Sequence, residues 1–174
     1  MSRLAALLLL PLLLVACTPA AVRPDVPPTH RAAELDPIAH WVGGRWVGTF
    51  EAGGRKFTLI RTYEWAFDGR VILGKSFAER DGTLVQQRET PFYWNPETRR
   101  IEFVDVLDNG GFGAGWLDRR DGQLYMDVRI VGNPKHPSWR GWVRESPDAQ
   151  VIRIEAQQGG TWVDFGTYAY RRER

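Results

Sequence analysis

The chain changes in character at Gly43-Gly44-Arg45-Trp46-Val47-Gly48-Thr49-Phe50. Before this stretch it is apolar and then rich in proline, and after it short runs of apolar and polar residues alternate between turn residues. We therefore expect the first strand of a β-domain at 45–51, within a domain that covers 35–174. Trp46 is predicted to fill one end of that domain, and Gly44 to let the chain turn into the strand.

Turn residues recur at short, even intervals after this point. Pairs such as Asp68-Gly69 and Asp121-Gly122 supply the positive φ angles of tight hairpin turns, and no long helical pattern separates them. The predicted strands are 45–51, 55–66, 70–79, 83–94, 99–107, 112–118, 123–131, 138–145, 150–157 and 161–171. Ten strands joined by short turns predict an all-β fold, an up-and-down antiparallel β-barrel, because closure removes the exposed edges. A β-sandwich with a similar number of strands is the alternative.

A short helix is predicted within 36–43, just before the first strand. Asp36 can cap its free N–H groups. Ile38, Trp41 and Val42 fall on one apolar face. Because a helix this short is not stable alone in water, we expect it to dock on the barrel and close one end.

The N-terminus resembles that of an exported bacterial lipoprotein. An apolar run at 4–16 follows the positive charge of Arg3; it is shorter than the roughly 20 residues of a membrane span and suits a secretory signal. The run ends in Leu14-Val15-Ala16-Cys17, which resembles the lipobox. The resemblance implies that 1–16 are a cleaved lipoprotein signal peptide and that Cys17 carries a palmitate-containing lipid anchor to the membrane. The alternative is an ordinary signal peptide followed by an unpaired thiol.

Cys17 is the single cysteine of the chain, so no disulfide can stabilise the fold. Thr18 follows it, which by resemblance to lipoprotein sorting in Gram-negative bacteria implies the periplasmic face of the outer membrane. The segment 17–34 holds four prolines among small and polar residues, a composition that favours extended, uncollapsed chain. At about 3.1 Å per residue, this tether would reach roughly 50 Å from the membrane.

The short helix followed by Gly44-Arg45-Trp46 resembles the Gly-x-Trp entry of the calycin superfamily, which includes lipocalins, fatty-acid-binding proteins and nitrobindin-like barrels. The resemblance rests on this one motif and on the number of strands. It implies a barrel whose interior holds a ligand. It also implies an arginine near the last strand that packs over the tryptophan, for which Arg171 and Arg172 are the candidates.

Aromatic residues are the unusual feature of the composition, which includes eight tryptophans. One face of 61–65 carries an arginine and two aromatic residues. A lumen that holds a small apolar or amphipathic ligand explains this pattern, and so does a filled core with amphipathic rings at its rim. Tryptophans on the strands also suit either a stacking surface for a planar or sugar-like ligand or an ordinary half-buried sheet surface. The residues that we predict to line a ligand site are Arg61, Tyr63, Trp65, Trp94, Tyr168 and Tyr170.

The sequence predicts no catalytic residue, no metal site and no cofactor, haem included. The serines have no evident histidine partner, and His30, His40 and His136 are not spaced as metal ligands. Nitrobindin-like haem binding uses a histidine inside the barrel. The last predicted strand, 161–171, contains none, so His136 is the residue that would have to serve. A net charge of +2 without a basic cluster excludes nucleic acid as a partner.

Three functions remain open from the sequence. The first is a membrane-anchored binding module with a small ligand in its lumen. The second is a structural or interaction lipoprotein of the cell envelope, with a filled barrel and an outer surface that contacts a protein partner. The third is an enzyme, for which the sequence shows no nucleophile, base and orienting group together.

Overall fold

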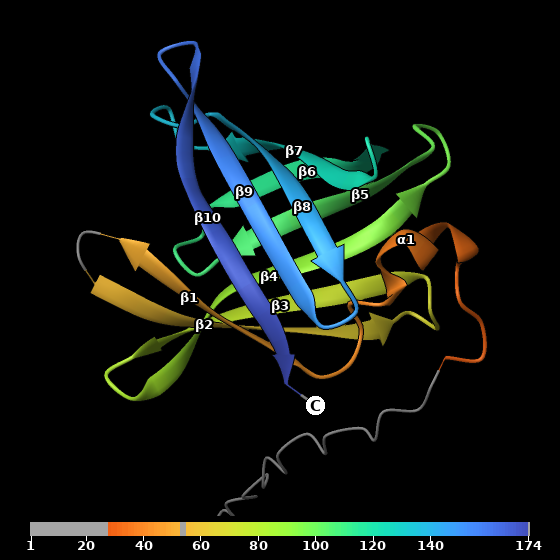
Figure 1. Cartoon of the computed structure of the whole chain (residues 1–174). Coiled ribbons are helices and arrows are strands. Elements are labelled where there is room, and N and C mark those ends of the chain that lie inside the picture. Colours follow the sequence, from red (N-terminus) through yellow and green to blue (C-terminus); the bar gives the residue numbers. More distant parts are fainter. Residues whose placement is uncertain (1–27, 53–54, 174) are drawn as a thin grey trace, which may run out of the picture.

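The computed structural model describes residues 28–52 and 55–173, which form a β-barrel with a short helical segment at one end (Figure 1). Ten antiparallel strands close in the order β1-β10-β9-β8-β7-β6-β5-β4-β3-β2. The strands are β1 (Arg45–Ala52), β2 (Arg55–Ala66), β3 (Val71–Arg80), β4 (Thr83–Asn95), β5 (Arg100–Leu107), β6 (Phe112–Arg120), β7 (Gln123–Val131), β8 (Ser138–Ser146), β9 (Ala149–Gln158) and β10 (Thr161–Glu173). The predicted up-and-down barrel is confirmed, and the sandwich alternative is wrong because β1 pairs with β10 and leaves one closed sheet.

The predicted lipobox, Cys17 and the tether as far as residue 27 lie outside the described residues. From residue 28 the chain runs along the β2–β3 turn, where the Ala32 N–H donates to the Gly69 carbonyl at 3.0 Å and the Thr29 hydroxyl donates to Asp68 at 2.9 Å. Within the described ranges, neither helical segment has the length and apolar character of a membrane span.

A 3₁₀ turn, η1 (Ala33–Leu35), leads directly into α1 (Asp36–Ala39), and together they lie against one end of the barrel (Figure 1). Leu35 and Ile38 are completely buried there, so the predicted docking of the apolar face is confirmed. The predicted cap by Asp36 is wrong. Asp36 already has helical dihedral angles (φ −51°, ψ −35°), whereas a capping residue needs an extended backbone, and no side chain caps α1.

Trp46 closes the same end of the barrel from within β1. Its side chain is completely buried, and its Nε1–H donates to the Trp41 carbonyl at 2.9 Å. The arginine that lies over the ring is Arg172, at 4.4 Å from the ring centroid. Gly44 has φ +72°, and a Cβ there would lie 2.8 Å from the Glu173 carbonyl oxygen, so a side chain at this position would be both strained and crowded.

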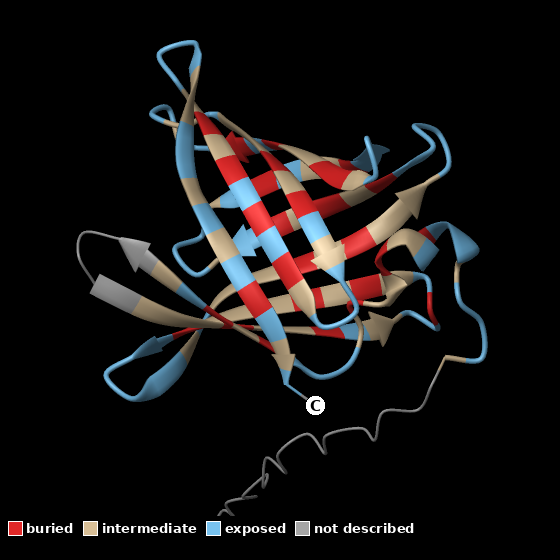
Figure 2. Ribbon diagram, in the orientation of Figure 1, coloured by how far each residue is buried: buried red, intermediate tan, exposed pale blue. Residues whose placement is uncertain are grey.

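Burial alternates along the strands, as Figure 2 shows most clearly on β9. Gln150, Ile152 and Ile154 point inward and are buried, while Val151 and Arg153 between them are exposed. The inward residues form one core cluster that continues into the helical segment. A bulge between Ser76 and Phe77 and another between Asp164 and Gly166 interrupt the alternation.

Candidate ligand site in the barrel interior

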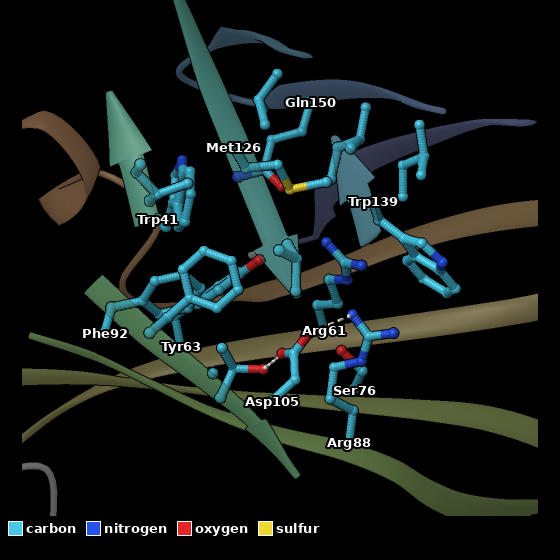
Figure 3. Close-up of a pocket in the computed structure, with 18 residues that line it drawn as sticks. Trp41, Arg61, Tyr63, Ser76, Arg88, Phe92, Asp105, Met126, Trp139 and Gln150 are labelled. Atoms are coloured by element: carbon cyan, nitrogen blue, oxygen red, sulfur yellow. Dashed lines mark hydrogen bonds and ion pairs between the residues drawn. The ribbon is translucent and has the colours of Figure 1, made fainter. Parts of the chain in front are cut away.

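The barrel interior contains a cavity of about 70 Å³ (Figure 3). This is more than the roughly 10–15 Å³ that a cavity needs to hold one water molecule. The barrel is therefore largely packed but not solid. Side chains from β2 through β9 and Trp41 from the segment after α1 line the cavity.

One part of the cavity wall is aromatic. The ring centroids of Trp41 and Tyr63 lie 5.3 Å apart, those of Trp41 and Phe92 5.6 Å apart, and those of Phe92 and Phe103 5.4 Å apart. Gly74 makes room for this group, since a Cβ there would lie 3.1 Å from the Tyr63 ring and 3.3 Å from the Phe92 ring. The aromatic wall can hold the apolar part of a ligand.

Another part of the wall is polar and arises from strand register. Arg61 on β2 pairs with Ser76 on β3, which pairs with Arg88 on β4, so three polar side chains share one level of the barrel. On β5, Asp105 accepts a hydrogen bond from the Thr90 hydroxyl at 2.6 Å. It also forms an ion pair with Arg88, whose Nη1 lies 3.2 Å from the carboxylate. Both oxygens of this buried carboxylate are thus engaged by neighbours.

Arg61 lies beside this pair and forms no ion pair with a carboxylate of the described residues. Its guanidinium lies 4.6 Å from the ring centroid of Tyr170, and its Nε is buried with no hydrogen-bond partner among the described residues. Burial opposes the charge of Arg61, but the neighbouring Tyr170, Tyr63 and Asp105 outweigh that effect and hold its pKa above the ordinary arginine value. The side chain therefore stays charged at every relevant pH.

Gln150 brings a second polar group into the cavity from β9. The side chain is 1% exposed, and neither its Oε1 nor its Nε2 has a partner among the described residues. Figure 3 shows Gln150 and Arg61 entering the cavity from different strands. An amide can donate and accept, so Gln150 can bind either end of a polar ligand group.

The six side chains predicted to line a ligand site are only partly brought together. Arg61 and Tyr63 line the cavity, whereas Tyr170 does not line it but packs against Arg61. Burial raises the pKa of Tyr63, which keeps its hydroxyl protonated.

The other three predicted residues lie away from the cavity. Trp65 packs against the core beside Arg31, whose guanidinium lies 5.3 Å from its ring centroid. Trp94 packs against the core without lining the cavity. Tyr168 stacks on Phe50 with the ring centroids 4.6 Å apart, and burial raises its pKa.

Five polar residues of the cavity were missed by sequence reasoning, namely Ser76, Arg88, Thr90, Asp105 and Gln150. A signal for two of them exists. Asp105 continues the inward face that starts at Ile101, and Gln150 continues the inward face of Ile152. A polar residue in phase with an alternating apolar face is a candidate for the interior.

No histidine among the described residues lines the cavity. His136 lies instead against Phe165, with the ring centroids 5.9 Å apart. In the part of the chain that the structure describes, no three His, Cys, Asp or Glu side chains are grouped as metal ligands.

Comparisons with known proteins place the fold but not the activity. No family model matches the chain. Over 97 residues the chain is 33% identical to the 1,4-alpha-glucan branching enzyme GlgB of Salinibacter ruber; this stretch is 55% of the chain but only 13% of that enzyme. The crystal structure of Rv2717c from M. tuberculosis is similar with a TM-score of 0.58 and 10% identity, over 83% of this chain and 100% of that one. At this identity the likeness shows a shared barrel fold alone.

Proposed function

We propose that this chain is an exported, lipid-anchored lipoprotein whose barrel binds a small amphipathic molecule in its interior. The observation that carries the proposal is the pairing of an aromatic wall with two buried polar groups, Arg61 Nε and the Gln150 amide, that have no hydrogen-bond partner among the described residues. Buried polar groups in folded proteins are nearly always hydrogen-bonded, and each one left unpaired costs about 1–3 kcal/mol. A ligand with a polar head would satisfy them.

The chemistry of the cavity matches that of small-molecule sites, which are mostly apolar with a few polar groups that fix orientation. The rings of Tyr63, Phe92 and Phe103 would contact the apolar part of the ligand. Arg61 and Gln150 would bind its polar part. Ligand size is limited by the cavity volume of about 70 Å³.

The test uses the tryptophans of the cavity wall as reporters. Trp41 and Trp139 line the cavity, so their fluorescence should change when a ligand enters. A panel of small amphipathic acids, amines, alcohols and amides is titrated into the purified domain, with calorimetry as a second readout. Ile152→Phe fills the cavity and should abolish binding, whereas Val151→Phe, on the outer face of the same strand, should not. Binding that survives Ile152→Phe in a folded protein would place the ligand elsewhere.

The lipid anchor is tested separately. We expect the full chain in a Gram-negative host to incorporate labelled palmitate and to fractionate with the outer membrane. Cys17→Ala should lose both properties. Equal labelling and fractionation of the two chains would remove the anchor from the proposal without affecting the ligand site.

A second candidate function uses the outer face of the barrel. Trp116, Tyr125 and Trp142, on β6, β7 and β8, form a row in which neighbouring ring centroids lie 5.5 and 5.6 Å apart. Arg140 extends it, with its guanidinium 5.5 Å from the Trp142 centroid and 4.4 Å from that of Trp162. Aromatic rows with polar neighbours suit sugar chains, and the stretch similar to an α-glucan branching enzyme favours a glucan.

Electrophoresis through gels that contain glycogen tests this candidate. Retardation of the wild type, lost in Trp116→Ala and Trp162→Ala, would support a glucan surface. Phe67→Ala is the control, because Phe67 is an exposed aromatic residue of the β2–β3 turn outside the row. If glycogen has no effect and crosslinking in cells instead captures one envelope protein on this face, the interaction lipoprotein is the better description.

A further inference from the structure

We infer that the interior ligand is a short-chain monocarboxylate. Its polar head carries a single negative charge and binds Arg61. This inference rests on the proposed function and names the class of ligand. The charges of the cavity wall are its starting point. The charged side chains that line the cavity are Arg61, Arg88 and Asp105, so the described lining carries one positive charge in excess.

The excess charge is located at Arg61 and not at Arg88. Asp105 forms its ion pair with Arg88 at 3.2 Å and takes its remaining hydrogen bond from Thr90 at 2.6 Å. Both oxygens of that carboxylate are thus engaged by Arg88 and Thr90, and Asp105 acts on Arg61 through its charge, with no ion pair between the two among the described residues. One buried carboxylate faces two buried guanidinium groups, and an unbalanced buried charge is costly. The direct contacts of Arg61 are with the neutral side chains of Tyr63 and Tyr170. An anion is the complement that this site lacks.

The hydrogen-bond donors fit a carboxylate. The Nε–H of Arg61 has no acceptor among the described residues, and the guanidinium can bind a carboxylate through two parallel hydrogen bonds. The Gln150 amide supplies a further N–H donor from β9. A cationic head would be repelled by Arg61, and a neutral head would leave its charge uncompensated.

The cavity volume sets the length of the chain. About 70 Å³ is only a few times the minimum of roughly 10–15 Å³ that one water molecule requires, so the ligand is small. Its carboxylate would lie at Arg61, and a short hydrocarbon would lie against Tyr63, Phe92 and Phe103. Long-chain fatty acids exceed this volume.

Calorimetry on the purified domain tests the inference with matched probes at constant ionic strength. Butyrate, butyramide and n-butylamine share one hydrocarbon chain and differ in the charge of the head. We expect butyrate to bind at least tenfold more tightly than the other two. In the series from acetate to octanoate, affinity should be highest near butyrate and fall at octanoate. Arg61→Met should reduce butyrate binding to the level of butyramide, whereas Arg129→Met, on the exposed outer face of β7, should leave it unchanged.

The outcomes separate this inference from the proposed function. If butyramide or butylamine binds as tightly as butyrate, the inference that the head group is an anion is wrong, and the proposed ligand site is unaffected. Preference for butyrate that persists in folded Arg61→Met would overturn the role of Arg61. Failure of every probe and of the wider panel to bind would overturn both. If Arg61→Met does not fold, the comparison of butyrate, butyramide and n-butylamine on the wild-type domain still tests the charge of the head group.

Discussion

Trp46 connects the helical segment, the first strand and the last strand through one side chain. It donates to the Trp41 carbonyl, and Arg172 lies over its ring. We expect Trp46→Ala to lower the free energy of unfolding by about 3–5 kcal/mol, because it removes a completely buried ring. Trp46→Phe keeps most of the ring and loses the hydrogen bond, so it should cost about 1–3 kcal/mol.

Urea denaturation measures both variants, with Val151→Ala as the control. Val151 is 40% exposed on the outer face of β9, and its truncation should change stability by less than about 0.5 kcal/mol. Equal stability of Trp46→Ala and the control would show that Trp46 does not support the barrel end.

Tyr63 gives the protein a predicted weakness at alkaline pH. Burial raises the pKa of its hydroxyl in the folded state above the ordinary tyrosine value of about 10. The folded state therefore holds this proton more tightly than the unfolded state. Its contribution to stability is complete below pH 10 and is lost as the pH rises from there through the folded pKa. We expect the urea midpoint of the wild type to fall above pH 10, and that of Tyr63→Phe to fall less. Parallel curves for the two proteins would contradict this role.

Single residues show how far the site could be predicted. Arg61 and Tyr63 were identified because an arginine and an aromatic residue share one face of a strand. Arg88 and Asp105 were missed because their partners lie on other strands, and Gln150 because its position in phase with Ile152 was not used. Asp105 is buried only because Arg88 and Thr90 satisfy it, and a strand sequence does not reveal which residues will face each other across a barrel.

At the scale of elements, Glu145 of β8 holds the helical segment on the barrel. Its carboxylate accepts a hydrogen bond from Trp41 Nε1 at 2.8 Å, and His40 Nε2 lies 3.1 Å from it. Arg119 bridges the same carboxylate and the Pro37 carbonyl, at 3.3 Å from each. The carboxylate is 11% exposed, so water competes weakly for these contacts.

We expect Glu145→Ala to loosen the segment more than it weakens the barrel. The free energy of unfolding should fall by about 1–3 kcal/mol, and hydrogen exchange should accelerate at residues 36–43. Glu64→Ala is the matched control. Its ion pair with Lys75 is exposed, and such pairs contribute at most about 1 kcal/mol. Unchanged exchange at 36–43 in Glu145→Ala would contradict the role of this carboxylate.

The strands themselves were predictable because turn residues with a recognisable backbone preference mark their ends. Asp68-Gly69, Asp81-Gly82 and Asp121-Gly122 have positive φ angles as predicted, and they end strands within one or two residues of the predicted positions. The bulges were not predictable. The register shift at Asp164/Gly166 leaves Phe165 38% exposed within β10, and nothing in the local alternation distinguishes that residue from its neighbours.

At the scale of the whole molecule, barrel closure followed from ten consecutive strands, but the state of the interior did not. Whether a barrel is hollow depends on the sum of side-chain volumes that meet from all strands. Inward glycines such as Gly74, Gly115 and Gly141 are already filled by neighbouring side chains, since an added Cβ would come within about 3 Å of Tyr63, Phe103 and Met126. The cavity of about 70 Å³ is what remains after that packing.

The number of strands also determines at which end of the barrel each turn lies. Because the number of strands is even, the chain enters and leaves the barrel at the same end, where Arg45 pairs with Glu173. The β9–β10 turn lies at the opposite end, and the β4–β5 turn lies at the entry end. An anchor at Cys17 would thus hold the entry end toward the lipid and present the β9–β10 tip to the periplasm. We expect a dye at Gln158→Cys to be quenched less by a membrane acceptor than a dye at Glu97→Cys. The reverse order would mean that the barrel stands inverted on its tether.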